Sequence, residues 1–121
     1  MSVVQSVFVI AVPDLKASAA FYRDVLGFSV HELASGWMHY SLGECRIMAG
    51  ECPDAIPPKD LGDHAFFAYL KVEGVEAFHE VVRAKGAPLC KPLKDESWGM
   101  REFGVRTADG HRIMFGQEIR K

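Results

Sequence analysis

The chain has 121 residues, of which 49% are hydrophobic and 25% charged, with a formal net charge of −2 at pH 7. These values are typical of one soluble globular domain with a sizeable core, and a near-neutral charge without a basic stripe argues against a nucleic-acid surface. Cys45, Cys52 and Cys90 match no metal-binding spacing, and the apolar run Val3–Val12 is too short to span a bilayer. We therefore expect a cytoplasmic protein with reduced thiols and no membrane partner.

The first half of the chain predicts one helix and four strands. Val3–Val12 is rich in Val and Ile and predicts a strand, which Pro13-Asp14 ends. Asp14 is a plausible N-cap for an amphipathic helix that runs to Leu26, and Gly27 suits the position just past its end. Three further strands are predicted at Phe28–Leu33, Trp37–Leu42 and Cys45–Ala49.

The same order of elements restarts after residues 51–63, a Pro- and Gly-containing segment that we interpret as a linker or a flap. A strand is predicted at Ala65–Val72, a helix from Val75 to Lys85, and a short strand at Leu89–Leu93. The last two strands, Arg101–Thr107 and Arg112–Gly116, are joined by Asp109-Gly110. This dipeptide is a strong hairpin signal, because glycine adopts the positive φ that such turns need.

The two halves of the chain are internal repeats. Both predicted helices end at a glycine, and the closing strands match, with CRIMAG at 45–50 and HRIMFG at 111–116. The sequence therefore predicts an α+β protein of two tandem β-α-β-β-β units, about 1–50 and about 64–121, within a single domain 1–121. We expect each unit to be a curved mixed sheet with one covering helix, so that the open faces form a cup-shaped cavity.

The first helix opens with VPDLKASAAFY at 12–22, followed by LGF at 26–28. On a duplicated unit, this pattern resembles the vicinal oxygen chelate superfamily, which includes glyoxalase I, extradiol dioxygenases, fosfomycin-modifying enzymes and bleomycin resistance proteins. The closing stretch, with Gly99, REF at 101–103, Val105-Arg106 and Asp109-Gly110, is most similar to the bleomycin resistance branch. The resemblance covers nearly the whole chain. It implies the glyoxalase/bleomycin resistance fold and a ligand pocket between two units of one chain or of two chains in a homodimer.

The metal enzymes of this superfamily carry His, Gln or Glu at inner positions of the first and last strands of each unit. The resemblance places these positions on Val7, Met48, Phe67 and Met114. Divalent first-row ions prefer imidazole nitrogen and carboxylate oxygen, which none of the four side chains supplies. The resemblance therefore implies a metal-free binder that uses no cofactor.

We expect the ligand-binding residues on the inner faces of the sheets. Their apolar and aromatic members suit a flat organic molecule, although plain core packing gives the same alternation. Glu102 could neutralise a cationic ligand, act as a base, or form an ion pair with Arg46, Arg106 or Arg112. The predicted set is Val7, Trp37, His39, Met48, Phe67, Tyr69, Glu102 and Met114.

These residues are compatible with two functional classes, a binding protein and an enzyme. The first is a metal-free homodimer that sequesters an organic, antibiotic-like and aromatic ligand, without nucleic acid or membrane partners. The second is a superfamily lyase, isomerase or dioxygenase, with Glu102 or His39 as base or with a displaced metal site drawn from His39, His64, Glu44 and Glu102. A structural domain whose own side chains fill the cavity is a third alternative. We predict the binder, with no catalytic residue.

Overall fold

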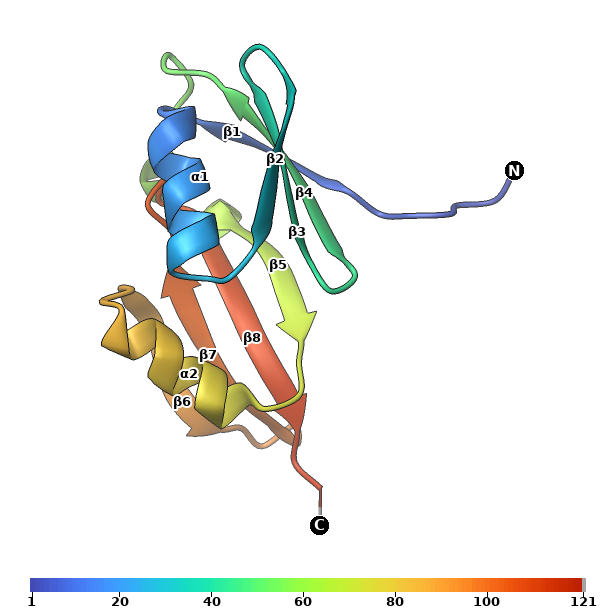
Figure 1. The fold of residues 1–121 in the computed structure, drawn as a ribbon. Helices are drawn as coiled ribbons and strands as arrows, with labels where there is room; N and C mark the ends of the chain where they lie inside the picture. Colours follow the sequence, from blue (N-terminus) through green and yellow to red (C-terminus); the bar gives the residue numbers. More distant parts are fainter. Residues whose placement is uncertain (121) are drawn as a thin grey trace. The chain divides into compact units, whose positions relative to one another are not determined.

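The computed structural model describes residues 1–120, apart from the side chains of Asp63 and His64. The chain divides into two compact units, Met1–Pro57 and Pro58–Lys121. Both contain the same order of elements, one strand, one helix and then three strands, as Figure 1 shows. The predicted α+β architecture of two tandem β-α-β-β-β units is confirmed.

The first unit has one helix on one face of a four-stranded mixed sheet (Figure 1). Its strand order is β1-β4-β3-β2, with β1 parallel to β4 and the other neighbours antiparallel. The elements are β1 (Phe8–Val12), α1 (Leu15–Asp24), β2 (Ser29–Ala34), β3 (Trp37–Leu42) and β4 (Cys45–Glu51).

The second unit repeats this topology with the strand order β5-β8-β7-β6, and again its first and last strands are parallel. A short 3₁₀ segment, Pro58–Ala65, precedes the sheet. The elements that follow are β5 (Phe66–Lys71), α2 (Val75–Ala84), β6 (Leu89–Asp95), β7 (Met100–Arg106) and β8 (Arg112–Glu118).

The two helices begin in corresponding ways. Asp14 is the N-cap of α1, and its carboxylate accepts a hydrogen bond from the Ala17 N–H at 3.1 Å. The first N–H of α1, at Leu15, donates to Glu51 at the end of β4 over 2.9 Å. In the second unit, the Val75 N–H donates to Gln117 of β8 over 3.0 Å. The closing strand of each unit thus satisfies a backbone donor that its own helix leaves unpaired.

Alternation along the strands separates a helix-covered face from an open face. In β4, Ile47 and Ala49 are fully buried beneath α1, while in β8 Ile113 and Phe115 are buried on the side of α2. The Tyr22 ring of α1 stacks on Tyr40 of β3 at a centroid distance of 4.5 Å. The intervening strand positions therefore form the open face of each sheet.

Most expected boundaries lie within two residues of those in the structure, and two differ by more. The first strand begins at Phe8 instead of Val3, because its pairing with β4 starts at Phe8 opposite Ile47. The predicted linker 51–63 is partly structured, since Glu51 belongs to β4 and the 3₁₀ segment starts at Pro58. Within the described residues, no helix is long and apolar enough to cross a membrane.

Candidate functional site

The open face of the first unit carries three of the predicted site residues. Trp37 and His39 alternate with the buried Tyr40 along β3, and strand pairing sets His39 beside Met48 and Trp37 beside Gly50. The Trp37 ring lies across Gly50, where an added Cβ would be 2.8 Å from the ring. Trp37 remains 38% exposed, so it covers the sheet without entering the core.

The open face of the second unit is built around Glu102 on β7. Its strand partner on β8 is Gly116, and the phenol ring of Tyr69 from β5 crosses over that glycine. A Cβ atom at Gly116 would overlap the Tyr69 hydroxyl oxygen. Gly50 and Gly116 occupy the same position in the two repeats, and each provides the space that an aromatic side chain needs.

Glu102 is 3% exposed and accepts hydrogen bonds on both carboxylate oxygens. Lys91 Nζ donates to Oε1 at 2.7 Å, and the Tyr69 hydroxyl donates to Oε2 at 2.5 Å. The indole N–H of Trp98 also donates to Oε2, at 3.4 Å. A buried carboxylate is costly unless it is paired and hydrogen-bonded, and these three donors meet that requirement.

The same contacts set the protonation of the cluster. Burial by itself would raise the pKa of Glu102, but the hydrogen bonds from Lys91, Tyr69 and Trp98 outweigh it and hold that pKa below its ordinary value. Burial and the hydrogen bond to Glu102 raise the pKa of Tyr69. Glu102 is therefore an ionised acceptor and Tyr69 a neutral donor at neutral pH.

Two members of this cluster, Lys91 and Trp98, were absent from the predicted set. The sequence pointed to an arginine as the ion-pair partner of Glu102, whereas the structure supplies Lys91 from β6. Lys91 also lies 5.4 Å from the centre of the Trp98 ring, which is 62% exposed. The available signal was a tryptophan beside a glycine, four residues before Glu102 and next to the strand that carries it.

The remaining predicted residues occupy less regular positions. Val7 is half-buried just before β1, and Met114 is half-buried on the open face of β8, opposite Tyr69. Phe67 lies at a β-bulge between Phe66 and Ala68, and its ring contacts His111 at a centroid distance of 5.4 Å. The bulge interrupts the alternation that was expected to place Phe67 and Tyr69 on one face.

The predicted alternative metal site includes His64, whose side chain lies outside the described residues. Within the described residues, no group of three or more His, Cys, Asp or Glu side chains is arranged to hold a metal ion. Glu102 already uses both oxygens for Lys91, Tyr69 and Trp98. The family resemblance assigns the superfamily metal positions to Val7, Met48, Phe67 and Met114, whose hydrocarbon and thioether groups do not fit a divalent first-row ion.

The duplicated fold agrees with what the chain is similar to. The model of the Glyoxalase/Bleomycin resistance protein/Dioxygenase superfamily matches residues 5–115. The chain belongs to this superfamily. It is 30% identical to the bleomycin resistance protein of Geobacillus stearothermophilus over 131 aligned positions, which cover 96% of this chain and 98% of the relative. A bleomycin resistance protein of Staphylococcus aureus matches to the same extent.

Solved structures share the fold at lower sequence identity. The bleomycin resistance determinant encoded on transposon Tn5 gives a TM-score of 0.77 at 20% identity, over 94% of this chain and 97% of that one. TnmS3, an antibiotic binding protein from Streptomyces sp. CB03234, gives 0.78 at 20% identity over 98% and 97%. The bleomycin-binding protein of Streptomyces verticillus gives 0.73 at 21% identity over 100% and 99%.

A double-mutant cycle tests whether the Tyr69 ring occupies the space above Gly116. Gly116→Ala should lower the free energy of unfolding by about 1–3 kcal/mol, because the new methyl group displaces Tyr69 from Glu102. In a Tyr69→Ala background the same change should cost less than about 0.5 kcal/mol. Urea unfolding of the four proteins measures both values. Equal costs in the two backgrounds would show that Tyr69 does not occupy this space.

Glu102 should also shape the stability of the protein in acid. Its pKa is lower in the folded than in the unfolded chain, so its contribution is full above the unfolded pKa of about 4.3 and is lost as the pH falls through the folded value. Glu102→Gln should lower stability by about 1.5–3 kcal/mol at neutral pH. The variant should then lose less stability than the wild type between about pH 6 and about pH 3. Urea unfolding across this range measures the difference, with Glu44→Gln on an exposed turn as the control; parallel profiles for wild type and Glu102→Gln would refute the assignment.

Proposed function

We propose that this chain is a metal-free binding protein that sequesters an antibiotic-like organic ligand with a flat aromatic part. The observation that carries the proposal is the Glu102 cluster. There, the buried carboxylate holds two aromatic side chains, Tyr69 and Trp98, in fixed positions on the open face of the second unit. Tyr69 is 44% exposed, so both rings offer surface to a partner molecule.

Aromatic rings that are held in place before a ligand arrives favour binding. A ring held in place before the ligand arrives loses little conformational entropy on binding, while its face still supplies apolar contact and stacking. Met114, beside Tyr69, adds a soft side chain that adapts to irregular shapes. On the first unit, Trp37, His39 and Met48 provide a comparable open surface. We propose that ligand contacts come from these residues together with Val7 and Phe67.

The relatives support the same class of function. Bleomycin resistance proteins share 30% identity over nearly the whole chain, and the structural neighbours include an antibiotic binding protein and a bleomycin-binding protein. Resistance by sequestration needs only affinity and a sufficient amount of protein. The proposal includes a homodimer, as the family resemblance implies.

The enzyme alternative lacks a suitable base at Glu102. A general base needs a free lone pair aimed at the substrate and a pKa close to the working pH. Both Glu102 oxygens already accept hydrogen bonds, and the pKa is lowered, which weakens the carboxylate as a base. Glu102 is therefore a positioning residue for Tyr69 and Trp98 in this proposal.

Calorimetric titration with bleomycin and a panel of planar aromatic antibiotics tests the binding role. At least one compound should bind saturably with a dissociation constant below about 10 μM. Trp98→Ala should weaken that binding by about tenfold or more, because a stacked ring contributes about 0.5–1.5 kcal/mol beyond the area it buries. Ile56→Ala, an exposed apolar change near the end of the first unit, is the matched control. Absence of saturable binding across the panel would contradict the proposal.

The metal-free part of the proposal has its own measurement on the same protein. After incubation with Ni, Mn, Fe or Zn and removal of loose ions, mass spectrometry should find less than about 0.1 equivalent per chain, because the superfamily positions lack suitable donors. Near one equivalent, lost in Glu102→Gln or in His39→Ala, would instead support the displaced metal site.

A further inference from the structure

A separate cavity lies on the helix-covered side of the first unit. It measures about 380 Å³ and opens between the start of α1 and the hairpin of β2 and β3. Leu15 and Ala19 of α1 line it with Ala34 and Met38, and the turn at Gly36-Trp37 borders it. Met38 points away from the face that carries His39 and Met48, so this cavity opens on the other face of the sheet, although Trp37 at its border also belongs to the proposed ligand surface.

Comparison of the two repeats explains why this space is open. The second unit fills the equivalent region with rings, since His79 packs on Phe103 at a centroid distance of 5.1 Å and Phe103 stacks on Phe115 at 5.4 Å. Aligning the helix starts and closing strands of the repeats puts Ala19, Met38 and Ala49 at these three positions of the first unit. The smaller side chains leave a cavity within the size range of small-molecule sites.

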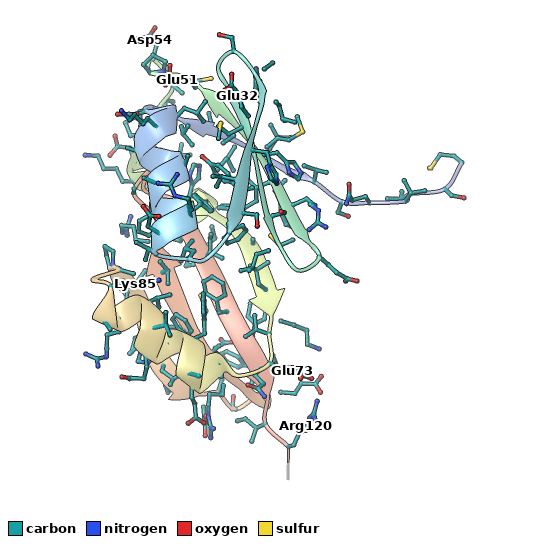
Figure 2. All side chains as sticks on the ribbon, viewed as in Figure 1. Glu32, Glu51, Asp54, Glu73, Lys85 and Arg120 are labelled. Carbon is teal, nitrogen blue, oxygen red and sulfur yellow. The ribbon has the colours of Figure 1, made fainter. Side chains whose placement is uncertain are left out.

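The rim of the cavity carries more negative than positive charge. Glu32 and Glu51 line it together with Lys16, and Figure 2 shows both carboxylates at the end of the unit where α1 begins. Glu32 makes none of the hydrogen bonds or ion pairs found among the described residues.

Glu51 uses one oxygen to accept the Leu15 N–H at 2.9 Å, but the neutral amide of Gln117 performs the same task for Val75 at 3.0 Å. Helix capping therefore does not require the charge of Glu51, which is available to a ligand.

We infer that this cavity binds a small organic cation, an ammonium group attached to an apolar body. The ammonium group donates to Glu32 and to the second oxygen of Glu51 at the rim, and the apolar body lies against Ala19, Ala34 and Met38. An ammonium group retains charge-assisted hydrogen bonds in this position, while its hydrocarbon part leaves water. An anion of the same shape would meet two carboxylates against one lysine.

Nuclear magnetic resonance titration with n-hexylammonium tests the inference, with n-hexanol and hexanoate as probes of matched length. Hexylammonium should shift the backbone amide signals of α1 and of the β2–β3 hairpin saturably, with a dissociation constant of about 1 mM. It should bind at least about threefold more tightly than hexanol, hexanoate should bind most weakly, and added salt should reduce the difference. Equal binding of the three probes, or shifts confined to other regions, would overturn the inference.

Four variants test the apolar contact and the charge contact that the inference predicts. Ala19→Leu fills the cavity and should weaken hexylammonium binding by about tenfold or more, because the apolar body loses its place. Glu32→Gln should weaken binding by about threefold and Lys16→Gln should strengthen it by about twofold, since both sites are exposed to solvent. Glu44→Gln, on the exposed β3–β4 turn, should leave it unchanged.

Circular dichroism checks that each variant is folded. If Ala19→Leu does not fold, Glu32→Gln and Lys16→Gln still test the inference, because they should change hexylammonium binding in opposite directions. The inference fails if a folded Ala19→Leu binds as the wild type does, or if the two charge variants change binding in the same direction.

Discussion

A carboxylate that is buried in the middle of a sheet needs hydrogen-bond donors, and this requirement determines the arrangement of the open face of the second unit. Glu102 draws Lys91 from β6, Tyr69 from β5 and Trp98 from the loop before β7. The Tyr69 ring crosses β8 to reach Glu102. It can do so because the residue beneath the ring is Gly116, which has no side chain. The aromatic rings proposed to contact ligand are thus held by hydrogen bonds to a buried, ionised carboxylate, and in this proposal ligand affinity depends on that carboxylate.

The two repeats keep one scaffold and differ in what they pack onto it. In both units the closing strand buries apolar side chains beneath the helix, carries a glycine on the open face, and has, at or next to its end, a residue that accepts the first helix N–H. The helix-covered cores then diverge, with a ring cluster in the second unit and a cavity in the first. Backbone hydrogen bonds make the scaffold hard to change, whereas side-chain volume can change one position at a time.

Membership of the superfamily fixes the fold, but the chemistry comes from individual side chains. The family resemblance places the ligand positions of the metal enzymes on Val7, Met48, Phe67 and Met114, which offer no nitrogen or oxygen ligand. The buried carboxylate of Glu102 on the second open face accepts hydrogen bonds from Tyr69 and Trp98, and the hydrogen bonds that it accepts lower its pKa. Both features support the proposed binding role.

The sequence by itself determined the order of the elements and the faces of the regular strands, because hydrophobic alternation, helix caps and turn glycines are local signals. It predicted the duplicated units, the Asp14 cap, and the common face of Trp37 and His39. Only the tertiary structure showed that Lys91 satisfies Glu102, that Trp98 joins the cluster, and that β1 begins at Phe8. These features depend on strand order, on bulges in β5 and β6 and on ring packing. Such contacts join residues that are distant in sequence, and local patterns do not encode which partner a buried charge will find.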